Sequence, residues 1–234
     1  MLLNVYIVNI ISANVYFVNM VCYDFLIYTA IGSGEKVMTK HSYHHGDLKT
    51  ELIRKGLKIL DEEGYEAFSM RKVATACNVS QTAPYRHFKD KNELIKAIAL
   101  NALREFDESL ERAFSETGDP KAQLKAMGRY YVQFFVDNPE TMRLLFFSQA
   151  QAWMREAVKN EYLCGDERPY SALEIAVKNY KAAYPDDERT EDELIVYCWG
   201  LVHGIAVLIV NGELPGGEAA MALVDKVIQS EKFL

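Results

Sequence analysis

The sequence predicts an all-α protein, with a three-helix helix-turn-helix unit first and a longer helical domain after it. The stretch Phe68–Lys91 contains two short helical patterns separated by a tight turn. Two further helix starts pair a cap residue with a Glu three positions later, at Asp90-x-x-Glu93 and at Thr190-x-x-Glu193. From Lys121 to Leu234 apolar residues recur at helical spacing, so we expect helices throughout.

Composition and charge are those of a globular chain with an uneven charge distribution. The chain has 234 residues, of which 50% are hydrophobic, and a net charge of −7. Between Met38 and Glu93 there are ten Lys and Arg against eight Asp and Glu, whereas from Leu94 onward there are fifteen against twenty-three. The first part can therefore approach phosphate groups while the second stays soluble. The four cysteines have no metal-ligand spacing, so we expect reduced thiols in a cytosolic protein, without a metal or cofactor.

Residues 1–37 form an apolar N-terminal extension with an Asn or Asp at every fifth position up to residue 24. A period of five fits neither a helix face nor a strand. The segment is long enough to span a bilayer, but the basic start of a signal peptide is missing because no Lys or Arg precedes Lys36. Gly34-Glu35 can be encoded by a sequence resembling a ribosome-binding site. We therefore expect translation to start at Met38, with a real membrane segment as the alternative.

A polar arm and a first helix come next. Thr39–Gly46 contains three histidines, but no acidic or cysteine partner is placed to complete a metal site. Asp47 opens the helix and Gly64 ends it. Gly56 should cost about 1 kcal/mol in an exposed helix, unless close helix packing requires the missing side chain. The apolar stripe of this helix comprises Leu48, Leu52, Ile53, Leu57 and Leu60.

The stretch Phe68–Lys91 is typical of a helix-turn-helix. Ser69 is an N-cap for its first helix. Asn78 lies where the chain leaves that helix, and Asn tolerates the left-handed conformation. Ser80 then caps a second helix through Phe88. Since the second helix of such a motif enters the major groove, this pattern predicts DNA binding. The apolar positions of the first helix are Met70, Val73, Ala74 and Cys77.

The predicted second helix contains a proline but suits DNA contact. With Ser80 as its cap, Pro84 is the fourth helical residue and removes only the first intrahelical hydrogen bond. Pattern alone leaves a solvated amphipathic helix as the alternative. The exposed side chains, which can meet base edges or phosphate oxygens, are Gln81, Thr82, Tyr85, Arg86 and His87.

Three runs of residues resemble the DNA-binding domain of the TetR family of transcriptional regulators. They are H-H-G-D-L (His44–Leu48), S-M-R-K-V-A (Ser69–Ala74) and V-S-Q-T-A-P-Y-R-H-F-K-D-K-N-E-L (Val79–Leu94). The match that contains them spans about fifty residues without a gap. The resemblance implies a first helix that supports the motif, a long fourth helix leading to a ligand-binding body, and a homodimer.

The resemblance also implies DNA contacts by Arg71, Ser80, Gln81, Thr82, Tyr85, His87 and Lys91. Gln81 and Thr82 lie nearest the base edges, where Gln can pair with adenine and Thr can touch a thymine methyl. Arg71 matches a position that reaches a base or an adjacent phosphate. Tyr85, His87 and Lys91 match positions that grip phosphates, and Ser80 adds a further phosphate contact to its cap role.

Helix four, from Asp90 to about Phe114, joins the two predicted domains. These are the DNA-binding domain, residues 38–93, and the ligand-binding and dimerisation domain, residues 94–234, whose first part (94–115) is the connecting helix. As the only covalent link, this helix is a natural lever. Two-fold half-sites need recognition helices about 34–36 Å apart or a multiple of that distance, so a tilt of the helix can weaken operator binding.

The second domain reads as five further helices. Asn138-Pro139 separates the first two, and Gly212 to Gly217 forms a turn before the last. The predicted ranges are 120–137, 139–157, 168–184, 194–210 and 218–230.

Aromatic and methionine side chains are dense in this domain and indicate either an ordinary core or a small-molecule pocket. Their mixture with side chains that carry a polar tip favours a pocket. The candidate lining residues are Met127, Tyr131, Phe134, Phe146, Phe147, Trp153, Tyr180, Trp199 and His203.

The run Y-C-W-G-L-V-H-G-I-A (Tyr197–Ala206) resembles the C-terminal WHG signature of one branch of the family. Gly200 and Gly204 lie four residues apart and leave a bare strip that another helix can approach. We therefore expect the last two helices to pair with their copies in a four-helix dimer interface. His203 is either an effector-sensing residue or a satisfied core histidine.

These patterns predict a cytoplasmic, homodimeric transcription factor. We expect a repressor that binds a near-palindromic double-stranded DNA operator and is released by a small, largely apolar effector. One alternative is an enzyme, but no nucleophile–base pairing, phosphate loop or H-E-x-x-H motif is present in the sequence. The other is a membrane-tethered DNA-binding sensor that uses residues 1–31, although no membrane partner is expected.

Overall fold

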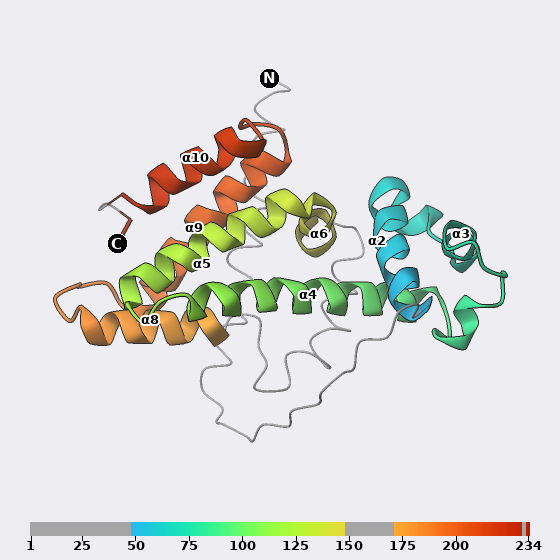
Figure 1. The fold of residues 1–234 in the computed structure, drawn as a ribbon, viewed down its shortest axis with the longest axis horizontal. Coiled ribbons are helices and arrows are strands. Elements are labelled where there is room, and N and C mark those ends of the chain that lie inside the picture. Colours follow the sequence, from blue (N-terminus) through green and yellow to red (C-terminus); the bar gives the residue numbers. More distant parts are fainter. Residues whose placement is uncertain (1–47, 148–170, 231–232) are drawn as a thin grey trace, which may run out of the picture. The chain divides into compact units, whose positions relative to one another are not determined.

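A computed structural model describes residues 48–147, 171–230 and 233–234, all of which belong to one unit, Val37–Leu234. The predictions for residues 1–47, including the start at Met38, and the pocket candidate Trp153 lie outside the described residues. Every element in the described part of the chain is a helix (Figure 1). The all-α fold class is therefore confirmed.

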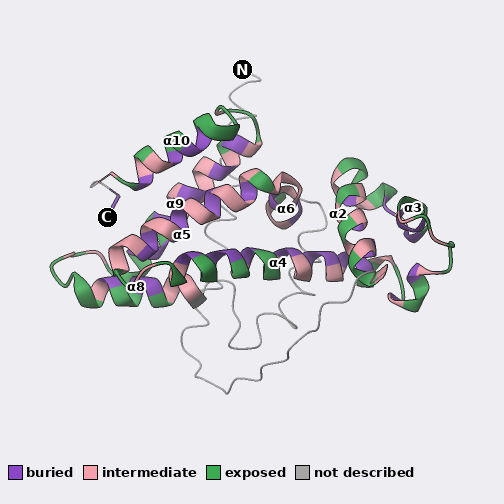
Figure 2. Cartoon of the chain, in the orientation of Figure 1, coloured by how far each residue is buried: buried purple, intermediate pink, exposed green. Residues whose placement is uncertain are grey.

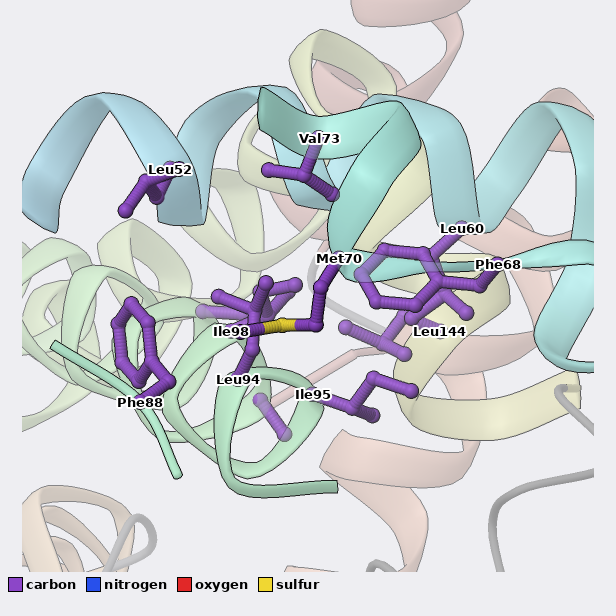
Figure 3. Packing of buried hydrophobic residues seen from close by; sticks show 12 residues of the cluster. Leu52, Leu60, Phe68, Met70, Val73, Phe88, Leu94, Ile95, Ile98 and Leu144 are labelled. Carbon is purple, nitrogen blue, oxygen red and sulfur yellow. The ribbon is translucent and has the colours of Figure 1, made fainter. Parts of the chain in front are cut away.

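The N-terminal part consists of α2 (Leu48–Ala67), α3 (Met70–Ala76), the short helix η1 (Pro84–Arg86) and the long helix α4 (Lys91–Ser115). Their buried side chains meet in one core, which one leucine of the distant segment η2 (Arg143–Phe147) completes (Figure 3). The labelled members of this core are Leu52, Leu60, Phe68, Met70, Val73, Phe88, Leu94, Ile95, Ile98 and Leu144.

Local signals place the ends of these helices as the sequence predicts. The Ser69 hydroxyl accepts a hydrogen bond from the backbone N–H of Lys72 and caps α3. Asp90 accepts from the first N–H groups of α4 at 2.9 and 3.0 Å. Asn78 adopts the left-handed conformation, with φ of 55°, and Gly64 interrupts α2 with φ of 78°. The predictions for Ser69, Asp90 and Asn78 are confirmed, whereas α2 does not end at Gly64: it is broken there and continues to Ala67.

The α-helix predicted over residues 80–88 is wrong. The chain makes a turn and then the 3-10 helix η1, in which N–H groups donate to carbonyls three residues back, beginning with Ala83 to Ser80 at 3.0 Å. Pro84 has no N–H to donate to the Ser80 carbonyl, and its ring would clash with that carbonyl in an α-helix. The predicted cap role of Ser80 is wrong as well, because the residue before η1 is Ala83 and no side chain caps this helix. The Ser80 hydroxyl instead lies 3.2 Å from the hydroxyl of Thr82.

Gly56 shows why an apparently unfavourable glycine belongs in α2. A Cβ atom at this position would lie 2.7 Å from Cδ1 of Ile98 on α4 and 3.7 Å from the Phe68 ring. The missing side chain thus lets α2 and α4 approach closely, which is the exception that the sequence left open.

The C-terminal part is arranged around α5 (Pro120–Asp137), which packs against α4, α8 (Ser171–Ala183), α9 (Glu191–Val210) and α10 (Gly217–Ile228). The predicted helix 139–157 begins as α6 (Pro139–Met142) and continues as a π-helical turn, η2 (Arg143–Phe147). The rest of that range lies outside the described residues. The other four predicted helices are present, with ends shifted by a few residues.

Helix α9 is the most apolar of the described helices. Thr190 and Glu193 form a complete capping box at its start, as predicted. Among the described residues it alone is long and apolar enough to cross a membrane, a test that core helices of soluble proteins also pass. Its surface alternates between buried and exposed positions (Figure 2).

Candidate DNA-binding interface and effector pocket

The predicted DNA contacts lie on and after α3, in a stretch that Figure 2 shows to be largely exposed. Pro84 is buried within this stretch, and Phe88 anchors it to the N-terminal core. Two predicted contacts, His87 and Lys91, are half-buried. The other five are exposed: Arg71, Ser80, Gln81, Thr82 and Tyr85.

The side chain of Gln81 is held by the preceding helix rather than left in solvent. Its Nε2 lies 3.3 Å from Oγ1 of Thr75, and the Thr75 hydroxyl donates to the carbonyl of Arg71 at 3.0 Å. Nearby, the hydroxyl groups of Ser80 and Thr82 bond to each other. Thr82 is exposed, and its methyl group suits an apolar contact such as one with a thymine methyl.

Lys91 is tied to the end of α2. Its ammonium donates to the Tyr65 carbonyl at 2.8 Å and lies 4.1 Å from the centre of the Tyr65 ring. The Tyr65 hydroxyl in turn donates to Asn92 at 2.9 Å. Since an ammonium has three N–H donors, two remain for a phosphate. Tyr65 thereby joins α2 to the start of α4.

In the body, a small cavity of about 30 Å³ lies between α4, α5, α8, α9 and Phe233. A volume of this size holds one or two water molecules. Three of the predicted pocket residues line it, namely Met127, Tyr131 and Trp199. The other lining residues are Leu110, Leu124, Gly128, Leu173, Cys198, Val202 and Phe233.

Tyr131 is the centre of a polar group within these apolar walls. The indole N–H of Trp199 donates to its hydroxyl at 3.2 Å, and that hydroxyl lies 2.8 Å from Nδ1 of His203. We assign the Tyr131 proton to the latter bond, which places the imidazole proton on Nε2. Burial lowers the pKa of His203 to about 4, so the ring is neutral at physiological pH.

The remaining pocket candidates divide into neighbours of this group and residues elsewhere. Phe146 packs on the His203 ring at 4.7 Å, and Phe134 packs on Phe106 at 5.3 Å. Tyr180 instead donates to Asp187 at 3.0 Å and is not among the cavity-lining residues. Phe147 is exposed.

The π-helical turn η2 touches both parts of the molecule. Nε and Nη2 of Arg143 donate to the two carboxylate oxygens of Asp61 on α2, at 2.6 and 2.7 Å. Leu144 is buried in the N-terminal core, and Phe146 contacts His203 of the body. Single turns of π-helix are often found at functional sites. This turn therefore connects the DNA-binding part directly to the neighbourhood of the cavity.

Sequence reasoning missed Thr75, Tyr65 and the pair Arg143–Asp61. The role of Thr75 could have been predicted, because Thr75 lies one helical turn after Arg71, on the helix that comes just before the predicted contact Gln81. The others had no signal, since each contact joins residues at least 26 positions apart.

An exposed turn follows α3 and rests on a buried core, and the long helix α4 leads from this part to a helical body. This arrangement defines a helix-turn-helix DNA-binding regulator. The chain belongs to the TetR family of bacterial regulatory proteins, whose DNA-binding model matches residues 52–98. A second model, the tetracycline-repressor-like C-terminal domain, matches residues 124–230. The proteins of this family are DNA-binding transcriptional regulators and not enzymes. The narrower WHG branch stays a prediction.

Individual relatives agree with this family. An uncharacterised helix-turn-helix transcriptional regulator of Haemophilus influenzae is 27% identical over 118 residues, 50% of this chain and 63% of the relative. A DNA-binding transcriptional repressor TetR of Mycobacteroides abscessus is 37% identical over 75 residues, 32% of this chain and 37% of the relative. The chain thus spans less than two thirds of the length of either.

A solved structure shares the fold over most of the chain. It is the fatty acid degradation regulator FadR of Bacillus halodurans, which superimposes with a TM-score of 0.61 at 15% identity. The match covers 80% of this chain and 95% of that protein.

Proposed function

We propose that this regulator is a ligand-responsive repressor. It binds a near-palindromic operator in the cytoplasm as a homodimer and leaves it when a small, largely apolar compound enters the body. In this proposal residues 38–93 read the DNA through the seven predicted contacts, and residues 94–234 bind the effector and the second copy. Regulators of the family bind DNA operators as dimers and respond to small molecules, which supports each part.

The observation that carries ligand response is the position of η2. One turn of π-helix holds Arg143 against Asp61 of the DNA-binding part and Phe146 against His203 of the body. A compound that displaces Phe146 would move Arg143, only three residues away. Such a compound releases DNA only if it binds the DNA-incompetent conformation more tightly than the competent one.

The cavity indicates the chemistry of the effector. The ten described residues that line it carry no formal charge, and the polar group beside it, Tyr131 with His203, is neutral. An uncharged compound with at most one or two hydrogen-bonding atoms suits these walls. Effector pockets measure roughly 300–1,000 Å³, so this cavity must open for a ligand to enter.

An exposed stripe on α9 supports the homodimer. Val196, Gly200, Gly204 and Leu208 follow one another at four-residue intervals, and the two large side chains are 45% and 43% exposed. Within the described part of the chain, no atom outside the helix's own nearby backbone lies within 4 Å of a Cβ built on either glycine. A second α9 can therefore approach this stripe closely, as in a two-fold interface.

Recovery of genomic fragments bound by the purified protein tests the proposal. A repressor of this kind should retain a near-palindromic sequence, and the genes beside it should suggest compounds to test for release. Compounds that release the DNA should be uncharged and apolar. A protein that is monomeric, or that recovers no preferred sequence at low salt, would contradict the proposal.

A further inference from the structure

Three residues at the start of the DNA-contacting stretch form a short hydrogen-bonded chain. The Thr75 hydroxyl donates its only proton to the Arg71 carbonyl at 3.0 Å. Its oxygen can therefore only accept from Gln81, whose side chain lies 3.3 Å away. The group of Gln81 that faces Thr75 must be its NH2 and not its carbonyl oxygen.

We propose that Thr75 is a positioning residue for sequence recognition: it fixes the amide of Gln81 in the orientation that reads adenine. The inference rests on the proposed function, since it requires Gln81 to face a base. Thr75 itself does not touch DNA in this account.

The hydrogen bond from Gln81 to Thr75 leaves the edge of the Gln81 amide that would read adenine available. A glutamine that reads adenine donates to N7 and accepts from N6. It uses Oε1 together with the Nε2 hydrogen on the same side as that oxygen. The other Nε2 hydrogen points away from Oε1, and it is the one left to bond Thr75. Positioning and base reading thus use different hydrogens and can occur together.

Without Thr75, Gln81 would start from many rotamers and from both amide orientations. Ordering a flexible side chain at an interface reduces affinity by about two- to twelvefold. This is the expected loss of discrimination, and it should fall on one base pair in each half-site. Contacts to phosphate should not change, so the dependence of binding on salt should stay the same.

The position of Thr75 makes it suitable for mutation. Its side chain is exposed. At the end of α3 the N–H of Asn78 donates to the backbone carbonyl of Thr75, and a change of the Thr75 side chain leaves that backbone bond in place. Valine has the same shape without the hydroxyl and a similar helix propensity. Serine keeps the hydroxyl and loses the methyl group.

The test selects bound sequences from a randomised operator library with five proteins: wild type, T75V, T75S, Q81A and the double variant Q81A/T75V. We expect T75V to broaden the preference at the base pair that Q81A alters, and T75S to keep it. We expect T75V to have no further effect when Gln81 is already absent, because the two then act as a unit. A T75V motif identical to that of wild type, or an effect that persists without Gln81, would overturn the inference.

A spectroscopic measurement tests the same contact without DNA. The two side-chain amide hydrogens of Gln81 should exchange with solvent at different rates in the wild type and in T75S, and at more nearly equal rates in T75V. Identical behaviour in all three would refute the role of Thr75. If instead the wild type selects no sequence at all, the proposed function fails as well, and the two failures are thereby distinguished.

Discussion

Asp61→Asn tests the link between the body and the DNA-binding part. The substitution keeps the shape of Asp61 but removes the charge that Arg143 bonds through two nitrogens. The Asp61 side chain is 18% exposed and that of Arg143 is 42% exposed. An ion pair so open to solvent contributes at the upper end of the range for surface pairs, about 1 kcal/mol.

The expected result has a sign as well as a size. In a repressor the effector-free conformation binds DNA, and in the proposed mechanism the bond between Asp61 and Arg143 stabilises that conformation. Losing about 1 kcal/mol shifts the conformational equilibrium about fivefold toward the released state. Because linkage is reciprocal, D61N should bind its operator up to fivefold more weakly and its effector up to fivefold more tightly.

Fluorescence titrations with labelled operator, and with effector in the absence of DNA, measure the two affinities. The control is E51Q, which makes the same change of charge on the same helix at a residue paired only locally, with Arg54. It corrects for the lower negative charge near DNA, which by itself favours binding. If D61N and E51Q change both affinities alike, η2 does not transmit the signal.

Three more predictions follow from the body. Gln123→Leu removes hydrogen bonds of 3.1 and 2.8 Å to the carbonyl groups of Phe114 and Thr117, between α4 and α5. It should reduce the free energy of unfolding by about 2 kcal/mol, measured with urea. The control Gln133→Leu, at a half-buried position that bonds only one turn ahead to Asp137, should have little effect. Gly200→Leu favours the helix but fills the α9 stripe, so sedimentation should show monomers with unchanged helix content, and a stable dimer would refute the stripe. His203 has a folded-state pKa of about 4 against 6.5, so the unfolded state takes up its proton first and stability falls as the pH drops from about 6.5 to 4. The loss is about 3 kcal/mol at most, and a pH series of denaturation curves should be flatter for H203Q.

The features that the sequence could predict are those decided by a few neighbouring residues. Ser69, Asp90 and Thr190 each cap a helix through a bond to an N–H two or three positions ahead. Asn78 takes the left-handed conformation that few other side chains tolerate. Such interactions involve residues only a few positions apart, so a sequence pattern is enough to predict them.

Pro84 shows where local reasoning was incomplete. Counting hydrogen bonds alone suggested that an α-helix loses only one at this position. The clash of the proline ring with the preceding turn acts as well. In the structure the N–H groups of Ala83 and of residues 85–87 donate to carbonyls three residues back, and only at Phe88 does a bond reach four residues back, to Pro84. The predicted contacts after Ser80 therefore stand on a turn and a 3-10 helix.

The arrangement of the pocket depends on contacts that no local pattern records. Tyr131 and His203 were both suggested by their polar tips, but many other aromatic residues shared that property. Their bond joins α5 to α9 across 72 positions. The bond between Asp61 and Arg143 likewise spans 82 positions. Such contacts follow from the packing of helices, and a single sequence contains no separate signal for them.

The two proposed roles of the body meet on one helix. Trp199 and His203 lie four residues apart on α9, so both reach the Tyr131 hydroxyl from successive turns. Gly200 and Gly204 follow them directly in the sequence and lie about 100° further around the helix. A ligand that moves Tyr131 therefore acts on the same rigid rod whose adjacent face is proposed to contact the second copy. In the proposed dimer the spacing of the DNA-binding parts depends on that contact, so the proposal gives the effector a second route to the operator beside η2.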